Sequence, residues 1–349
     1  MRGMARTIGV EVGWVVDHYT GLFPQEAWEK NLIKRSKNDS GRYFDWQVVA
    51  GRMSRSKLSL GVGVTEAIRR HPVTLAQAAL TMSHLSNKPF ILGIGAGEAE
   101  NLIPYGLPFD RPVARLEEAL QIIRECFDSS GPIDFDGKFF RLDRATMSLG
   151  PGRGGKPRIW IAAHGTRMLR LTGKYGDGWL PTIPMSPKVY AGSLGVIKAA
   201  AEDAGRRVES ITPAMQVFYV VASSRRTAEK YLEHPSIKYL CLLAPESVWR
   251  RAGLTHPLGE GFRGFVDVVP AYLSREEIMT AIEKVPAEFA ASQVIWGTAD
   301  DIVSSIQALA EVGLRHAVLA PVSPMVSRKA LAHTARTLPG IVRRLRTGN

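Results

Sequence analysis

The chain has 349 residues, of which 45% are hydrophobic and 22% charged, and a formal net charge of +12 at pH 7. It contains no run of about 18 apolar residues that could span a bilayer, and its N-terminal apolar stretch is broken by Glu11 without a cleavage site, so we expect a cytoplasmic protein. The positive charge favours an anionic small-molecule partner over nucleic acid, because basic pairs such as Arg69-Arg70 are scattered and carry no nucleic-acid-binding motif; a solvated basic surface explains the charge equally well.

Short apolar runs alternate with helical patterns from one end of the chain to the other. The runs that predict strands lie at about 9–16, 58–63, 90–95, 158–162, 178–181, 214–221 and 316–320. Continuous apolar strands alternating with helices indicate an α/β protein with a parallel sheet covered by helices. An open doubly wound sheet and a closed (β/α)8 barrel both fit this pattern, and we favour the barrel because no GxGxxG motif follows the first strand.

Three helices are predicted from their spacing and their starts. Apolar residues repeat at intervals of three and four at Val113, Leu116, Leu120, Ile123 and Phe127, and again at Tyr190, Leu194, Ile197 and Ala201. Such a repeat puts an apolar stripe on one face of a helix. Thr298 and Asp301 precede a third stripe and predict a capped helix start.

Residues 223–297 carry no clear strand, are rich in Pro and Gly, and show helical patterns at about 236–252 and 274–284. This length exceeds a usual connection, so we expect an excursion at one end of a single barrel domain spanning 1–349, where substrates are selected. Two interpretations of its apolar residues stay open, the lining of a pocket for a lipid-like substrate and a small core of the excursion. These residues are Phe262, Phe265, Val266, Val268 and Val269.

Polar and glycine-rich segments follow four successive predicted strands. They are Asp17-His18, Gly61–Thr65, Gly95–Glu98 and Ala162–Gly165. The carboxyl ends of parallel barrel strands build one face, so we expect these segments to line one cavity. Each also has a structural interpretation: Asp17 as a turn cap, His18 as a buried structural histidine, and Glu98 as a first-turn helix acid.

Cysteine and histidine spacing predicts neither a disulfide nor a metal site. The two cysteines, Cys126 and Cys241, are far apart, and the eight histidines form no recognisable ligand pattern with cysteine or carboxylate.

Several stretches together resemble the bacterial luciferase-like superfamily, in its branch of coenzyme F420-dependent oxidoreductases. They are GWVVDH, LGVGVT, FILGIGAGEAEN, RIWIAAHGTRMLRLTGKYGDGWLP and WGTADDI. Within that branch, PVARLEEAL and THPLGEGF are most similar to the mycobacterial phthiodiolone dimycocerosate ketoreductases. The resemblance covers nearly the whole chain and implies a (β/α)8 barrel with the deazaflavin lying across the strand C-termini.

The resemblance also implies roles for individual residues. His18 matches an active-site histidine, with Asp17 beside it near the ring system, and Glu98 and Asn101 match an acid and an amide near ring and substrate. The Gly63-Val64 bond matches a place where family members hold a non-proline cis peptide. The implied cofactor-binding residues are Asp17, Gly63, Val64, Thr65, Gly95, Ala96, Gly97, Asn101, Ala163, His164, Gly165, Thr166 and Arg167, the last five holding the phosphate.

The implied reaction is hydride transfer between F420 and a carbonyl compound, in the manner of a ketoreductase acting on an apolar or lipid ketone such as phthiodiolone. Reduction of a ketone creates an alkoxide, which needs a proton donor with a pKa near neutrality; His18 is the first candidate and Glu98 the second. Two alternatives stay open, an FMN-dependent luciferase-like monooxygenase and a non-catalytic flavin- or deazaflavin-binding protein. A homodimer is also left open, because dimers are common in the family.

The family pattern normally begins with a strand and a helix before the strand that ends in Asp-His. About 25 residues of that pattern are absent here. We therefore expect a barrel that lacks its first strand and part of its first helix, with two unpaired strand edges, and we favour a longer native chain.

Overall fold

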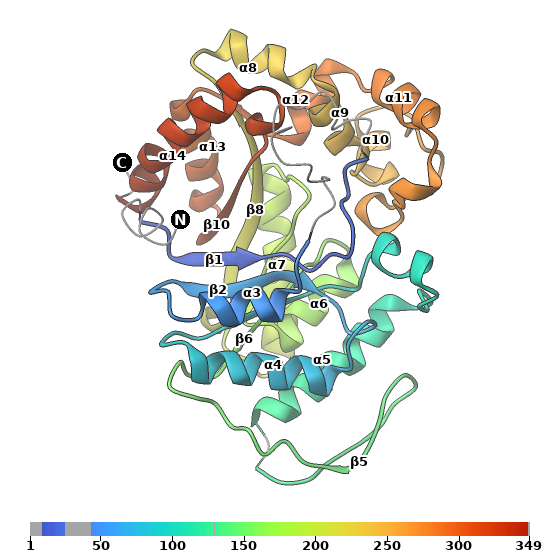
Figure 1. The fold of residues 1–349 in the computed structure, drawn as a ribbon, viewed down its shortest axis with the longest axis vertical. Coiled ribbons are helices and arrows are strands. Elements are labelled where there is room, and N and C mark those ends of the chain that lie inside the picture. Colours follow the sequence, from blue (N-terminus) through green and yellow to red (C-terminus); the bar gives the residue numbers. More distant parts are fainter. Residues whose placement is uncertain (1–8, 25–42, 129, 348–349) are drawn as a thin grey trace.

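The structure is a computed structural model, and it describes residues 9–24, 43–128 and 130–347. A parallel sheet curls through the middle of the molecule as a half-barrel, with helices around it (Figure 1). Its strands, in spatial order, are β1 (Val12–Val15), β2 (Ser59–Thr65), β3 (Ile91–Ile94), β6 (Arg158–Ile161), β7 (Gly178–Trp179), β8 (Thr212–Val221) and β10 (His316–Pro321). The predicted α/β barrel fold is confirmed in this open form.

Helices connect successive strands and pack against the sheet. Those of the barrel are α3 (Trp46–Met53), α4 (Pro72–Leu85), α5 (Pro112–Asp128), α6 (Thr166–Tyr175), α7 (Pro187–Asp203), α13 (Ala299–Glu311) and α14 (Arg328–Thr347). The short 3-10 helices are η1 (Ala99–Asn101), η2 (Ile103–Tyr105), η3 (Val208–Ser210), η4 (Gly264–Val266), η5 (Pro270–Tyr272) and η6 (Ser323–Met325). Within residues 9–24, 43–128 and 130–347, no helix is long and apolar enough to cross a bilayer.

The predicted helical stripes are the buried faces of real helices. The four stripe residues of α7, from Tyr190 to Ala201, are its buried residues. Thr298 and Asp301 form a reciprocal capping box at the start of α13. Sequence periodicity therefore located these helices correctly, because in each case the apolar face meets the core cluster of the barrel.

The excursion folds as a group of helices with its own apolar cluster. Its helices are α8 (Arg225–Leu232), α9 (Pro235–Leu242), α10 (Glu246–Arg251), α11 (Arg275–Glu283) and α12 (Ala287–Gln293). Val268 is buried in this cluster, and Phe262 and Phe265 pack against it, so the small-core interpretation is confirmed. Phe262, Val268 and Val269 also line a cavity of about 740 Å³, so the two interpretations are compatible.

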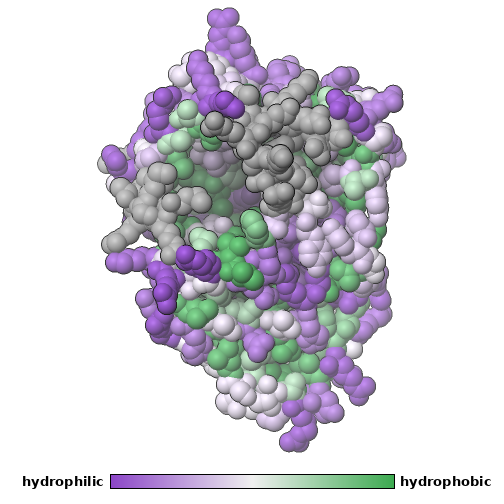
Figure 2. All heavy atoms as spheres, viewed as in Figure 1, coloured by the Kyte–Doolittle hydropathy of each residue, from purple (hydrophilic) through white to green (hydrophobic). Residues whose placement is uncertain are grey.

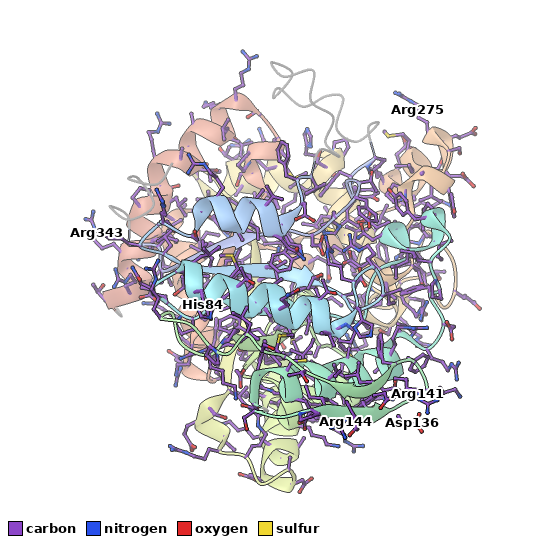
Figure 3. The ribbon with its side chains drawn as sticks, turned by 60° about the horizontal axis from the view of Figure 1, so that its bottom comes forward. His84, Asp136, Arg141, Arg144, Arg275 and Arg343 are labelled. Atoms are coloured by element: carbon purple, nitrogen blue, oxygen red, sulfur yellow. The ribbon has the colours of Figure 1, made fainter. Side chains whose placement is uncertain are left out.

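The prediction of seven strands needs correction, because the described residues form ten, and three of these were not predicted. The excursion ends in β9 (Ile295–Gly297), which pairs with the end of β8 and is too short to give a sequence pattern. An antiparallel hairpin of β4 (Ile133–Asp136) and β5 (Arg141–Ala145) was also missed. Its strands carry exposed charges rather than an apolar run, as Asp136 and Arg141 illustrate at the edge of the molecule (Figure 3).

The strands β1 and β10 form the two ends of the sheet. Within the described ranges, neither has a further strand on its other side. A cavity of about 670 Å³ is lined by both strands and by α14, and the ring of Trp14 lies edge-on to that of His316 at 6.2 Å between centroids. Hydrophobic residues line a hollow on this face of the molecule (Figure 2). The expected opening in the barrel is therefore present between β1 and β10.

The register of the parallel strands brings their carboxyl ends to one edge. Val15 of β1 pairs with Val62, Thr65 of β2 with Ile94, and Ile94 of β3 with Ile161 of β6. Three of the predicted polar segments, Asp17-His18, Gly95–Glu98 and Ala162–Gly165, therefore lie just beyond β1, β3 and β6 at this edge. The fourth, Gly61–Thr65, was predicted to follow its strand but is the end of β2 itself.

Candidate active site

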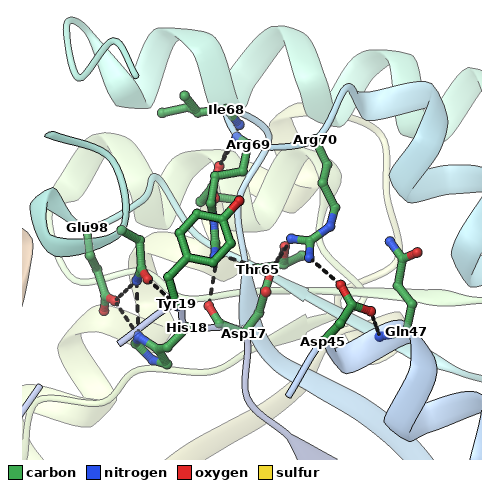
Figure 4. A network of polar contacts seen from close by, with 12 residues as sticks. Asp17, His18, Tyr19, Asp45, Gln47, Thr65, Ile68, Arg69, Arg70 and Glu98 are labelled. Atoms are coloured by element: carbon green, nitrogen blue, oxygen red, sulfur yellow. Dashed lines mark hydrogen bonds and ion pairs between the residues drawn. The ribbon is translucent and has the colours of Figure 1, made fainter. Parts of the chain in front are cut away.

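A cluster of polar side chains surrounds the imidazole of His18, just beyond the end of β1 (Figure 4). His18 Nδ1 lies 2.7 Å from Glu100 Oε1, 3.0 Å from Asn101 Nδ2 and 3.7 Å from Glu98 Oε2. Glu98 precedes η1, and η1 carries the other two residues after β3. We call His18, Glu98, Glu100 and Asn101 the His18 cluster.

Two carboxyl groups of unequal exposure face the imidazole in the His18 cluster. The Glu100 side chain is fully buried, whereas that of Glu98 is 28% exposed. Burial raises the pKa of Glu98 to about 7. The Glu100 carboxylate also raises this pKa, whereas the charges of His18 and Arg69 lower it. Burial alone would lower the pKa of His18, but the hydrogen bond to Glu100 and the charges of both acids outweigh it and raise that pKa. The His18 cluster therefore holds exchangeable protons near neutral pH.

Asn101 is held in one orientation by the backbone. Its Oδ1 accepts a hydrogen bond from Tyr19 N–H at 2.9 Å. The opposite amide atom, Nδ2, consequently faces His18 Nδ1 and lies 3.3 Å from Glu100 Oε1. The predicted neighbourhood of His18, Glu98 and Asn101 is thus present in the structure.

Asp17 points into a different set of partners. Its Oδ2 accepts hydrogen bonds from Thr65 Oγ1 at 2.6 Å and from Arg70 Nη1 at 2.7 Å, and lies 3.1 Å from Arg69 Nη2. Arg69 also forms an ion pair with Glu66. We call Asp17, Thr65, Glu66, Arg69 and Arg70 the Asp17 network. The carboxylate of Asp17 makes no hydrogen bond to the imidazole of His18, so its catalytic role stays a prediction.

The Asp17 network changes the interpretation of one basic pair. The side chain of Arg69 is only 2% exposed and that of Arg70 only 16%. A solvated basic surface does not describe these two residues, because their charges are directed into the protein against Asp17 and Glu66.

The glycine-rich end of β2 and the turn after β3 lie beside these clusters. The Gly63-Val64 peptide is cis, which confirms the expectation drawn from the resemblance. Gly95 N–H donates to the carbonyl of Thr65 at 2.9 Å, and a side chain at Gly95 would meet the Val64 side chain at 3.3 Å. Gly97 has φ of +98°, which favours glycine immediately before Glu98.

The predicted phosphate-binding segment, Ala163–Arg167, forms the start of α6. No side chain caps this helix at Gly165, and the space beside Gly165 is open. Arg167 is exposed and pairs with Glu117 at 2.9 Å. Free N–H groups at the start of a helix bind anions, so this end of α6 suits a phosphate. Among described residues, no hydrogen bond or ion pair links the segment to the His18 cluster.

His164 carries a polar atom without a partner. Its Nε2 accepts a hydrogen bond from Thr182 N–H at 3.2 Å, which leaves the proton on Nδ1. Nδ1 is buried and has no hydrogen-bond partner. Burial lowers the pKa of His164 to about 4, so the imidazole is neutral at physiological pH.

Sequence reasoning missed four residues of these clusters: Glu66, Arg69, Arg70 and Glu100. The available signal for Glu100 was a second acid two positions after Glu98 in GEAEN. The structure also brings together ligand atoms of His18, Glu98 and Glu100 within 4.8 Å of one another, a spacing that could hold a metal ion. Spacing along the sequence could not reveal this group, because His18 comes from a different strand end. The expectation of no metal stays a prediction.

Comparisons with known proteins agree on one family. A family model described as luciferase-like monooxygenase matches residues 14–316. A phthiodiolone/phenolphthiodiolone dimycocerosates ketoreductase from Mycobacterium bovis is 38% identical over 323 residues, which cover 90% of this chain and 84% of that protein. An F420-dependent glucose-6-phosphate dehydrogenase from Nakamurella multipartita is 28% identical over 275 residues, covering 77% and 73% of the two chains. The solved structure of an F420-dependent secondary alcohol dehydrogenase in complex with an F420-acetone adduct has a TM-score of 0.73 at 19% identity, covering 97% of this chain and 92% of that chain, and supports the fold.

Proposed function

This chain belongs to the luciferase-like monooxygenase family and is an oxidoreductase, and from that premise we propose that it transfers a hydride between coenzyme F420 and a carbonyl or alcohol substrate. The observation that carries the proposal is the His18 cluster at the carboxyl edge of the sheet, where two acids face Nδ1 of an imidazole with a raised pKa. When bound, F420 would supply the hydride. The protein must then supply a proton to the alkoxide.

In the proposed reaction, His18 is the proton donor. The acids of the His18 cluster keep its imidazole protonated to higher pH than an isolated histidine. A donor whose pKa lies near the working pH transfers its proton readily and is recharged readily. Glu98, with its pKa raised to about 7, is the second donor.

Two features of the structure fit an anionic, flat cofactor. The start of α6 has no side-chain cap, so its free N–H groups are donors for a phosphate. His164, just before this helix in the sequence, adds a buried Nδ1–H without a partner. The end of β2 and the turn after β3 offer backbone with few side chains for the ring. The residues proposed to hold the ring are Asp17, Gly63, Val64, Thr65, Gly95, Ala96, Gly97 and Asn101, and those proposed to hold the phosphate are Ala163, His164, Gly165, Thr166 and Arg167. The net charge of +12 would help to attract a polyanionic tail.

An apolar carbonyl compound is the proposed substrate class, with a lipid ketone such as phthiodiolone as one member. The cavity of about 740 Å³ supports this, because it lies between η2, directly after the Glu100-Asn101 turn, and the excursion. Ile103, Phe262 and Tyr272 are among its apolar lining residues. The apolar part of the lining would stabilise hydrocarbon by removing it from water. Asp267, Glu276, Glu277 and Lys284 line the same cavity.

Titration of the purified protein with F420 and, separately, with FMN tests the proposal. We expect binding of F420 and reduction of an apolar ketone by reduced F420. Tight FMN binding without F420 binding would favour an FMN-dependent monooxygenase. Binding of F420 without turnover of any carbonyl compound or alcohol would favour a non-catalytic binding protein.

A further inference from the structure

Glu100 is the buried acid that contacts the imidazole directly, and we propose that it is a positioning residue that fixes the tautomer of His18, so that Nε2 is the atom that exchanges a proton with the substrate. The inference rests on the proposed function for the identity of the proton acceptor. The contact between Glu100 and His18 does not depend on that function and is testable without it.

The Glu100 carboxylate is buried and contacts the imidazole of His18. Its side chain is fully buried, and Oε1 lies 2.7 Å from His18 Nδ1, a distance typical of a charge-assisted hydrogen bond. Its other oxygen, Oε2, is buried without a hydrogen-bond partner. A buried carboxylate is costly unless a neighbour compensates its charge, and the Nδ1–H of His18 does so. Asn101 Nδ2 is also a donor and lies 3.0 Å from Nδ1 and 3.3 Å from Oε1, so in the proposed tautomer both N–H groups donate to Oε1 and none is shared between Nδ2 and Nδ1.

The other imidazole nitrogen is left free by this arrangement. All contacts of the His18 cluster are made to Nδ1, and in the part of the chain that the structure describes Nε2 has no hydrogen-bond partner. The side chain of His18 is 14% exposed. With Nδ1–H donating to Glu100, Nε2 is the only ring nitrogen that can lose and regain a proton. A buried acid holds the imidazole of catalytic triads in the same way.

The proton transfer balances without any further group. The Nε2–H bond of the imidazolium breaks as the O–H bond of the product alcohol forms, while the hydride comes from the cofactor of the proposed reaction. His18 is left neutral with its remaining proton on Nδ1, still donated to Glu100. In the direction of alcohol oxidation, Nε2 accepts the hydroxyl proton.

Other charged groups also face His18 and must be separated from Glu100 in any test. Glu98 and Glu100 raise the pKa of His18, whereas burial and Arg69 lower it. The Tyr43 ring lies 5.2 Å from the imidazole between centroids. Glu98 stands 3.7 Å from Nδ1, beyond hydrogen-bond distance, so Glu98→Gln is the matched control for Glu100→Gln.

Nitrogen NMR of the selectively labelled imidazole, recorded without cofactor, is the first test. In the wild type above the pKa of His18, we expect a neutral ring with the proton on Nδ1. In Glu100→Gln we expect a mixture of tautomers and a lower pKa for His18, whereas Glu98→Gln keeps the Nδ1–H tautomer. A wild-type ring protonated on Nε2, or the same tautomer in wild type and Glu100→Gln, would overturn the proposal.

Turnover with reduced F420 and a ketone is the second test. In Glu100→Gln, we expect kcat to fall by about 10²-fold with little change in KM, and the alkaline limb of the kcat profile to move to lower pH. An unmoved limb and an unchanged kcat would overturn the positioning role. If the wild type shows the expected tautomer but neither binds F420 nor turns over, the proposed function fails while the assignment of Glu100 to Nδ1 stands.

Discussion

Asp17 and His18 are neighbours in the sequence, yet the Asp17 network and the His18 cluster differ in how their charges are matched. In the Asp17 network, two guanidinium groups face two carboxylates, and Asp17 Oδ2 has three cationic or hydroxyl partners. In the His18 cluster, two acids face one imidazole, and one carboxylate oxygen has no partner.

This difference in charge balance suggests that the Asp17 network stabilises the fold, whereas the His18 cluster binds and releases protons. Removing one member of a matched group of buried charges leaves the others uncompensated, so such a group stabilises one geometry. An excess of acids around an imidazole is compensated by protons, which are mobile. Density of charge alone would not distinguish these regions, whereas the balance of charge does.

The largest effect is expected from removal of the Asp17 charge. Asp17→Asn leaves the buried guanidinium groups of Arg69 and Arg70 without their shared carboxylate, so we expect the free energy of unfolding to fall by about 3 kcal/mol or more. Denaturant unfolding measures this. Asp45→Asn, at an exposed acid that also pairs with Arg70, is the matched control, and an Asp17→Asn protein as stable as the wild type would contradict the assignment.

Removal of the imidazole should act on turnover instead. We expect His18→Ala to reduce kcat by about 10²-fold or more, since the alkoxide loses its proton donor, and to leave F420 affinity nearly unchanged. Steady-state kinetics and equilibrium titration measure the two quantities. Activity equal to the wild type would remove His18 from the mechanism.

Glu98 should give a smaller effect that depends on pH. Its pKa in the folded protein is raised from near 4.5 to about 7, so its contribution to stability is fully present below about pH 4.5 and is lost as pH rises through about 7. Because the side chain is 28% exposed, we discount the effect to about 1 to 2 kcal/mol. The unfolding free energy of wild type minus that of Glu98→Gln should decrease by this amount from about pH 5 to about pH 8. If this difference in unfolding free energy did not change with pH, the pKa of Glu98 would not be raised in the folded protein.

The smallest effect is expected at the exposed margin of the Asp17 network. Asp45 pairs with Arg70 at 2.9 Å but its side chain is 47% exposed, and it also caps α3. Asparagine is an equally good cap, so Asp45→Asn should remove only a surface ion pair and cost about 0.5 kcal/mol. A loss as large as that of Asp17→Asn in the same unfolding assay would mean that burial is not what separates the two acids.

The sequence predicted the elements that follow simple periodic rules. Strands and helices with clear apolar patterns were located correctly, and the rule that parallel strands end at one edge brought His18 and Glu98 to the same region. The cis peptide at Gly63-Val64 was expected from the resemblance alone. The hairpin of β4 and β5 was missed because its residues are charged and exposed, and β9 because three residues carry no pattern.

The partners of the polar residues were harder to predict. Whether Arg69 and Arg70 are solvated or buried depends on Asp17, which lies about fifty residues earlier in the chain. The direction of the Glu100 side chain depends on the turn of η1, which has only three residues. Such contacts are set by tertiary packing, so composition and spacing locate a site without assigning its bonds.

The pairing of β1 with β2 has a consequence for how this gene can vary. Trp14 pairs with Gly61 and Val15 with Val62, and side chains alternate between the two sides of a strand. Loss of a single codon within β1 would move each following residue back by one position, so the imidazole would come to the place where Asp17 now meets Arg69 and Arg70. We therefore expect β1 to exclude insertions and deletions of one residue, and a deletion scan of the gene would record that constraint as a sharp loss of function between codons 12 and 17.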